Sequence, residues 1–361
     1  MLDRTLLMQE FQKKANLLFY QADDQIAYAY QLWQEVTHNP DYAHLLPIKS
    51  SSLSIPHWHG SLTDYHTHAA LQDAYYVASI DGSQIYPDRH QGINCFLINI
   101  GVTTFDYGKG SFNGVSIPYV FAAHEYDQGN EIVDYLRNDY ERYSIFDCTL
   151  PSDMYTSLLL DGCLLQHEFK DNDVGSFFEQ RYTAFLYTLY QRHIMAAWYI
   201  SAPRYKEVIR LLYAHLGADS LDKKKYQAID QVTDAMLMAR ILRPCERSTI
   251  FFYQDPSSQK IPFAASACFF YMHVGSEIVR IELPIYIALN EQYCSLLCSI
   301  ILDQVHKGQG YPIALSEAHE QAVVDTQDRT FFYAALDMLG LQYNKKILLT
   351  PKQIKKNIVG I

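Results

Sequence analysis

The stretches VASIDGS (Val77–Ser83) and LLLDGCLL (Leu158–Leu165) decide the fold, because each is an apolar run that reaches an aspartate followed by glycine. The apolar residues predict two buried strands of one sheet. Each aspartate would then leave the core at the rim of the sheet, where the glycine lets the backbone or a ligand approach closely. Paired carboxylates are suited to a divalent metal ion. The sequence therefore predicts a metal site between Asp81 and Asp161.

Composition places the chain among folded globular proteins and argues against one class of nucleic-acid-binding protein. Of its 361 residues, 49% are hydrophobic and 19% are charged, which predicts a large core in one large domain or two ordinary ones. The net charge of −11 excludes a protein that grips nucleic acid with its whole surface, because phosphate binding requires basic residues. A local basic channel, or metal ions that bring positive charge to the phosphate, would be compatible with this acidity.

The cysteines and the N-terminal residues indicate the cellular compartment in which the protein is expected. Seven cysteines, none of them in a CxxC spacing, indicate reduced thiols rather than disulfides or a zinc ribbon. The N-terminus MLDRTLLMQEF carries an acid where a signal peptide is basic, and every long apolar stretch contains a polar break. We therefore expect a soluble cytoplasmic protein that has no membrane partner.

Apolar periodicity predicts helices that flank a mixed sheet. We expect helices over residues 1–45 (closed by Pro40 and Pro47), 131–143, 177–198, from 204, 291–306 and 316–324. We expect strands that end at Asp81 and Asp161, and others over 95–102, 103–107, 199–202, 248–253, 264–274, 277–283 and 311–315, with a turn over 108–114. A meander followed by strands that alternate with helices indicates an α/β fold.

A third carboxylate is expected on the helix between the two aspartate strands. Phosphoryl-transfer sites with two metals use several carboxylates to hold ions ~4 Å apart. Glu141 in RNDYERY is the first choice, and Glu131 at the start of the same helix is the alternative. For any single helical glutamate, a solvated surface position is the competing interpretation.

The segment GYPIALSEAHEQAVV (Gly310–Val324) adds a tyrosine and a histidine. Its pattern predicts a short strand that leads into a helix. His319 could bind a metal, orient a phosphate or transfer a proton near neutral pH. Tyr311 could position a phosphate or a water molecule through its hydroxyl group. These two residues join the three acidic ones as candidate catalytic residues.

Together these motifs resemble the NurA nuclease domain family. The resemblance rests on VASIDGSQIYPDRHQGINCFLINIGVTTFDYG, LLLDGCLL and GYPIALSEAHEQAVV, with further matches at YISAPRYKEV, RPCERSTIFF and HVGSEIVRIELP, over residues 59–330. It implies an RNase H-like core, related to the catalytic domain of Argonaute proteins. It also implies manganese-dependent exonuclease activity on DNA, endonuclease activity on single strands, and a homodimer that works with the hexameric translocase HerA in DNA end processing.

The resemblance also implies roles for particular residues. Asp81 and Asp161 match the family's metal-binding aspartates, and Tyr311 and His319 match its catalytic tyrosine and histidine. The context LRNDYE favours Glu141 as the family's glutamate. We therefore expect Mn²⁺, with Mg²⁺ as the alternative, to be held by the three acids and His319. A catalytically silent subunit that docks or loads a translocase is the alternative function, and repair and anti-phage defence both stay open as roles.

Basic and histidine-rich segments suggest further contacts. Arg204, Lys206 and Arg247 are the candidate phosphate contacts, because their charge and donor geometry match phosphate. Four histidines in HWHGSLTDYHTH, at positions 57, 59, 66 and 68, could form a separate metal site or an ordinary hairpin. The segments expected are a helical region, a NurA-like nuclease domain and a lysine-rich helical tail, over residues 1–56, 57–330 and 331–361.

Overall fold

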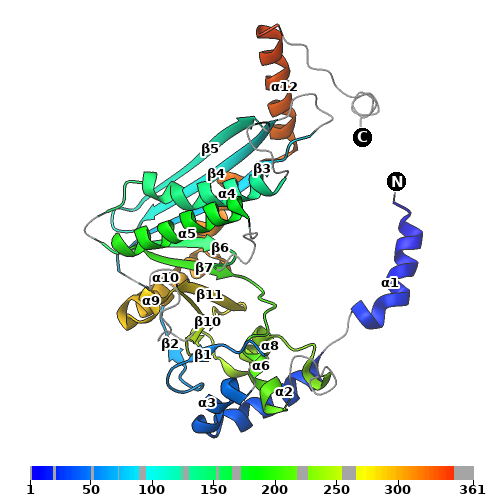
Figure 1. Ribbon diagram of the computed structural model, residues 1–361, viewed down its shortest axis with the longest axis vertical. Coiled ribbons are helices and arrows are strands. Elements are labelled where there is room, and N and C mark those ends of the chain that lie inside the picture. The colour runs from blue at the N-terminus through cyan, green and yellow to red at the C-terminus, as the bar shows by residue number, and fades with distance from the viewer. Residues whose placement is uncertain are drawn as a thin grey trace.

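The computed structural model describes residues 2–18, 22–49, 53–71, 73–88, 95–122, 124, 130–151, 154–164, 172–217, 227–253 and 266–344. Its strands are β1 (His57–Trp58), β2 (His66–Thr67), β3 (Tyr76–Ile85), β4 (Cys95–Asp106), β5 (Ser111–Ala122), β6 (Thr156–Asp161), β7 (Met195–Ile200), β8 (Glu246–Arg247), β9 (Phe251–Phe252), β10 (Ala267–His273) and β11 (Ile278–Pro284). They form one sheet in the order β1-β9-β10-β11-β7-β6-β3-β4-β5, and β8 joins β2 to β10 (Figure 1).

The helices are α1 (Arg4–Leu18), α2 (Asp23–Thr37), α3 (Pro40–Lys49), α4 (Asn130–Tyr143), α5 (Asp173–Gln191), α6 (Ile209–His215), α8 (Asp234–Ile241), α9 (Ile285–Ala288), α10 (Glu291–Lys307), α11 (Ile313–Ala322) and α12 (Thr326–Gln342). Except for α1 and α12, which extend away from the sheet (Figure 1), the helices cover both faces of the sheet and its β9–β10 end. None of these helices in the described part of the chain has the length and apolarity that a bilayer crossing requires.

The half of the sheet from β5 to β7 has the strand order of an RNase H-like fold. Strands β3, β4 and β5 form an antiparallel meander. Strands β6 and β7 then add in parallel on the other side of β3. Helices α4 and α5 precede these two parallel strands, as parallel connections require. The expected α/β fold, a mixed sheet flanked by helices, is confirmed.

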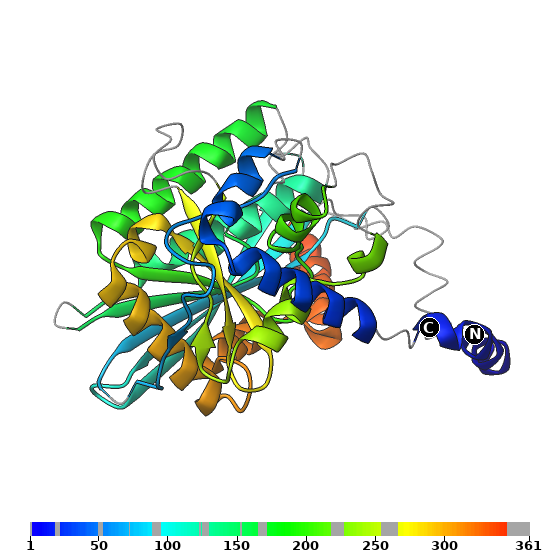
Figure 2. The ribbon, with the colours of Figure 1, turned by 90° about the horizontal axis from the view of Figure 1, so that it is seen from below.

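The two faces of the sheet pack against different helices. Val77 belongs to a core that includes Leu297 of α10, whereas its neighbour Ala78 belongs to a core that includes Phe185 of α5. This alternation follows from the strand period of two residues. Figure 2 shows α5 and α10 on opposite sides of the strands. A third core surrounds α2, α3, α6 and α8 next to β9 and β10.

Strand β3 does not end at Asp81 as predicted, because its two neighbours differ in length. Strand β4 pairs with β3 from Tyr76 to Ile85, whereas β6 pairs with it only as far as Ile80. The continuous β4 ladder keeps β3 extended beyond the aspartate. Asp81 is nevertheless the first residue of β3 that does not pair with β6, so it still lies at the edge of the sheet where β6 ends.

Long-range strand pairing also overturns other boundary predictions. Residues 95–106 form one strand instead of two, and residues 111–122 form β5, although the turn was expected to reach Gly114. Residues 195–198 are in β7 instead of a helix, because the chain pairs there with both β6 and β11. Residues 199–200 are the last two residues of β7, in agreement with the strand predicted over residues 199–202.

Three helical boundaries are corrected as well. The helix expected from Arg204 begins at Ile209, where the side chain of Asp234 accepts hydrogen bonds from the first backbone N–H groups. The strand expected over residues 311–315 is absent, since α11 begins at Ile313 directly after a proline. The single N-terminal helix is replaced by α1, α2 and α3. Pro40 begins α3 because proline suits the first turn of a helix.

Helix α12 lies in the expected C-terminal segment and extends beyond the β5 side of the sheet (Figure 1). No residue of this described helix is buried. The lysines at positions 345–356 and the run 223–225 lie outside the described residues. All seven cysteines are free thiols, as expected, but Cys163 is exposed.

Candidate active site

Parallel pairing of β3 with β6 brings the two strand aspartates together. The last pair in this ladder is Ile80 opposite Leu160, so the next residue on each strand is Asp81 or Asp161. Burial raises the pKa of the Asp161 carboxyl group, and the nearby charge of Asp81 raises it further. The structure therefore places two carboxylates side by side at the end of β6.

Glu141 reaches this pair from α4 through the space that Gly82 leaves open. A β-carbon at Gly82 would overlap Glu141 Oε1 and lie 2.9 Å from its Cγ. Arg137, one turn earlier on α4, donates from Nη1 to Glu141 Oε1 at 2.9 Å and to the Gly82 carbonyl at 3.1 Å. Burial raises the pKa of Glu141 to about 7; the Arg137 charge lowers it, and the Asp81 and Asp161 charges raise it.

His319 and Tyr311 complete the site from α11 and the residues just before it. His319 Nδ1 lies 2.7 Å from Asp81 Oδ2, and because an ionised carboxylate only accepts, the Nδ1–H group donates. Tyr311 is hydrogen-bonded to Asp161, and burial together with the Asp161 charge raises the pKa of its hydroxyl group. Its ring packs edge-on against Tyr199, with ring centres 5.4 Å apart.

Side chains of the sheet hold α11 in place through its carbonyl groups. Thr103 Oγ1 donates to the Ala314 carbonyl at 2.9 Å. At the other end, Asn99 Nδ2 and Ser83 Oγ donate to the Ala322 carbonyl at 2.9 and 2.5 Å. The last carbonyls of a helix have no partner within the helix, so the bonds from Asn99 and Ser83 satisfy the Ala322 carbonyl. Together with the Thr103 bond at the other end, they fix the position of the helix that carries His319.

The three carboxylates line a cavity of about 300 Å³ at the end of β6. Within the described residues, no three His, Cys, Asp or Glu side chains lie close enough together to hold one ion. The donor chemistry fits a hard divalent cation, because it consists of carboxylate oxygens and one imidazole. A cation would also relieve the repulsion that raises the carboxylate pKa values. A larger cavity of about 670 Å³ between α4 and α5 contains neither strand aspartate.

The alternative glutamate lies away from this cavity. Glu131 is in the first turn of α4, ten residues before Glu141, which corresponds to about 15 Å along the helix. The structure therefore brings Glu141, and not Glu131, to the aspartate pair. Our sequence reasoning missed Arg137, although its spacing of four residues from Glu141 is a recognisable ion-pair signal.

The three predicted phosphate contacts have different environments. Arg204 is exposed after β7, whereas Lys206 donates to the carbonyl of Asp230. Arg247 is only 4% exposed, and its guanidinium group donates to the Ser248 carbonyl. Pairing of β8 with β10 and β2 turns this arginine inward, so its side chain is not open to a phosphate in this structure, and its role in DNA binding stays a prediction.

The four histidines near the N-terminus divide between separate strands. Residues 57 and 59 lie in and after β1, which pairs with β9, whereas residues 66 and 68 lie in and after β2, which pairs with β8. Across the described ranges these histidines are not part of a site with three or more metal-binding side chains. The positions of these histidines follow from the pairing of β1 with β9 and of β2 with β8.

Comparisons with known proteins give a family model and distant structural likenesses. The model described as the NurA domain matches residues 76–324, more than half of the chain. The crystal structure of NurA with manganese is 11% identical over 76% of this chain and 91% of that chain, with a TM-score of 0.43. That of NurA bound to dAMP and manganese is 12% identical over 75% and 89%, with a TM-score of 0.40.

The crystal structure of Drosophila Piwi is 13% identical over 70% of this chain and 30% of that chain, with a TM-score of 0.30. No curated protein matches the chain. The family assignment rests on the family model, whose matched residues include all five candidate catalytic residues.

Proposed function

The chain belongs to the NurA domain family, and from this premise we propose that it is a metal-dependent nuclease that hydrolyses phosphodiester bonds in DNA. The observation that carries the proposal is that Asp81, Glu141 and Asp161 line one cavity at the rim of the sheet. We extend it to exonuclease activity on DNA ends and endonuclease activity on single strands. These carboxylates also weigh against the silent docking subunit, which would not need acids at this rim.

Asp81, Glu141, Asp161 and His319 would hold Mn²⁺, or Mg²⁺ in its place, in a two-metal site. Such ions, when bound, polarise the scissile phosphate and lower the pKa of an attacking water molecule. Tyr311 would keep Asp161 oriented through its hydrogen bond. With its Nδ1–H group on Asp81, His319 has one lone pair left, on Nε2, and this nitrogen would bind the ion.

A nuclease assay with and without manganese tests this function. We expect the purified chain to degrade single-stranded and double-stranded DNA in Mn²⁺ and to lose this activity in EDTA. Mn²⁺ binding, measured by calorimetry without DNA, should weaken in the Asp161→Asn variant. A chain that leaves every DNA substrate intact in Mn²⁺, also when a HerA-type ATPase is present, would contradict the nuclease function and favour the docking role.

Gly82→Ala is expected to reduce DNA cleavage about 10- to 100-fold, because the new methyl group displaces the Glu141 carboxylate from the aspartate pair. The melting temperature should also fall, because the new β-carbon would lie 2.9 Å from Glu141 Cγ and 3.0 Å from Arg137 Cγ, so both side chains of α4 must shift. Steady-state cleavage and a thermal melt measure the two effects. Full activity in this variant would show that the observed position of Glu141 is not required.

We also propose that the protein acts as a homodimer with a HerA-type hexameric ATPase. The support for a self-association surface is the exposed apolar face of α12, where Phe331, Met338 and Leu341 are 74, 65 and 73% exposed. Next to it, β5 is the last strand on its side of the described sheet. Light scattering should give twice the chain mass of 41.7 kDa, and a Phe331→Ser/Leu341→Ser variant should give the monomer mass.

A further inference from the structure

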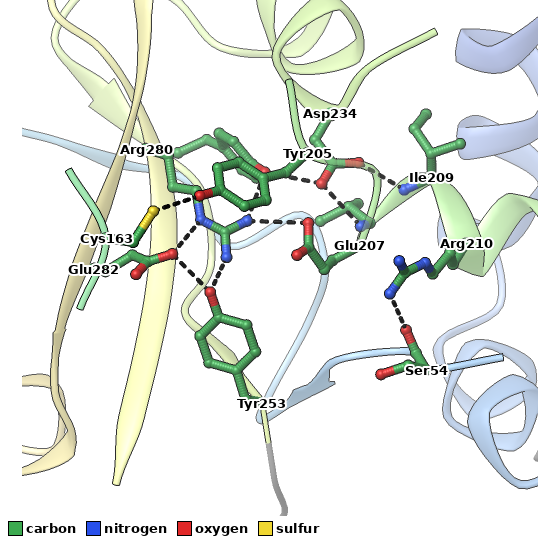
Figure 3. Close-up of polar contacts among 12 residues, drawn as sticks. Ser54, Cys163, Tyr205, Glu207, Ile209, Arg210, Asp234, Tyr253, Arg280 and Glu282 are labelled. Atoms are coloured by element: carbon green, nitrogen blue, oxygen red, sulfur yellow. Dashed lines mark hydrogen bonds and ion pairs between the residues drawn. The ribbon is translucent and has the colours of Figure 1, made fainter. Parts of the chain in front are cut away.

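A fully buried arginine lies in β11, outside the residues that line the candidate active site. The Arg280 side chain is 0% exposed, and its Nε donates to Glu282 Oε1 at 2.8 Å (Figure 3). Its Nη1 donates to Glu207 Oε2 at 3.2 Å and to the Tyr271 hydroxyl at 3.0 Å. Burial of a guanidinium group is costly even when it is paired, and it often serves specificity rather than stability. This arrangement therefore points to a function of Arg280 and its polar partners other than packing.

The partner carboxylate connects this cluster to the chain that follows Asp161. Glu282 Oε2 accepts the backbone N–H of Leu164 at 2.8 Å. Its other oxygen, which pairs with Arg280, also accepts the Tyr253 hydroxyl at 2.6 Å. Leu164 is buried, so its N–H group would have no partner if Glu282 turned away. One side of Glu282 is thus fixed by Arg280 and Tyr253, and the other side holds the backbone.

The short segment 162–164 determines how Asp161 sits at the end of β6. Asp161 is beyond the β3–β6 ladder and pairs only with Tyr199 of β7. The next residue, Gly162, turns the chain with a φ of +88°. Cys163 Sγ lies 2.7 Å from the hydroxyl of Tyr205, whose ring stacks on the Arg280 guanidinium at 4.0 Å. Two contacts of this segment therefore lead back to the same buried arginine, and Figure 3 shows the one through Cys163 and Tyr205.

We propose that Arg280 and Glu282 form a positioning pair that fixes the Asp161 carboxylate by anchoring the segment 162–164. Arg280 orients Glu282, and Glu282 holds the Leu164 N–H group. Neither side chain lines the active-site cavity, so both act through Asp161. This inference rests on the proposed nuclease function, because Asp161 is taken as a metal ligand there.

Two double variants that lack the charges of residues 280 and 282 distinguish the positioning role of Glu282 from the effect of burying its charge. R280M/E282Q removes both charges but keeps a side-chain oxygen that can accept the Leu164 N–H. R280M/E282L removes both charges and that acceptor as well. Replacement of a buried ion pair by apolar side chains of similar size often preserves stability, so both variants should fold. They differ in the polar group that can bind the Leu164 N–H and the Tyr253 hydroxyl, whereas the unpaired Glu207 carboxylate is the same in both. Melting curves check that each variant is folded.

The first readout is hydrogen exchange of the amide groups in residues 156–164, which does not depend on activity. We expect faster exchange in R280M/E282L than in wild type, and near-wild-type exchange in R280M/E282Q. The second readout is DNA cleavage in Mn²⁺. R280M/E282L should lose about 10- to 100-fold in kcat, with KM for DNA within about twofold of wild type, because a misplaced ligand affects the chemical step. R280M/E282Q should recover most of this loss.

Tyr253→Phe gives a test that leaves both charges in place. It removes one hydrogen bond that orients Glu282 and should shift both readouts in the same direction by a smaller factor, about threefold. Equal exchange in wild type and R280M/E282L, or equal loss of kcat in the two double variants, would overturn the positioning role. Inactive wild-type protein would overturn the proposed function instead, and the exchange data would still decide whether Glu282 anchors the segment.

Discussion

Asp81→Ala is expected to abolish DNA cleavage, with a loss of about 10³-fold or more in kcat. Asp81 is central to the site, because it neighbours Asp161 and accepts the Nδ1–H group of His319 at 2.7 Å. Metal ions contribute several kcal/mol of transition-state stabilisation, and ~4 kcal/mol corresponds to about 10³-fold in rate. Loss of this carboxylate should remove that contribution and also leave His319 without its orienting partner.

The same substitution should leave the protein folded. The Asp81 charge raises the pKa values of both Asp161 and Glu141, so its removal relieves repulsion among neighbouring acids. We therefore expect an unchanged or higher melting temperature together with lost cleavage. Glu131→Ala is the matched control, because this acid lies in the first turn of α4 away from the cavity, and it should retain activity. Active Asp81→Ala protein would disprove the assignment of this site.

Gly101→Ala is expected to destabilise the fold by about 3 kcal/mol and to reduce cleavage about 100-fold. Gly101 lies directly opposite Asp81 in the β3–β4 ladder. A β-carbon there would overlap the Ala318 carbonyl and lie 2.5 Å from the Ala322 amide nitrogen. These are backbone atoms of α11, so the helix itself must move away from the sheet. Because His319 is on that helix, its contact with Asp81 should be lost.

Thermal melts and cleavage assays, run at a temperature where the variant is still folded, measure both effects. Gly114→Ala on the neighbouring strand is the control, since the three atoms nearest to a β-carbon there are side-chain atoms of Phe112 and Gln321, the nearest at 3.1 Å. This control should cost less than about 1 kcal/mol. A Gly101→Ala variant with wild-type stability would show that α11 is not seated against β4 as described.

Local sequence patterns were sufficient to predict three elements that carry the candidate site, β3, β6 and α4, but the strand expected at Tyr311 is absent. The two apolar runs form strands because their side chains must be buried, and the amphipathic pattern at residues 131–143 forms α4 because its apolar face must cover the sheet. Asp81 and Asp161 could be identified because a charged residue directly after such a run must come to a rim. Each of these patterns depends only on residues that are close together in the chain, so it can be recognised without knowledge of the tertiary structure.

Tertiary structure alone decided how these elements meet. Glu141 rather than Glu131 approaches the aspartates, because Gly82 on a different element leaves room for it. Arg247 points inward, because β8 pairs with strands far away in sequence. The length of β3 likewise depends on its pairing with β4. The physical reason is that a local pattern specifies which face of an element is apolar, whereas position in space follows from partners that the pattern does not name.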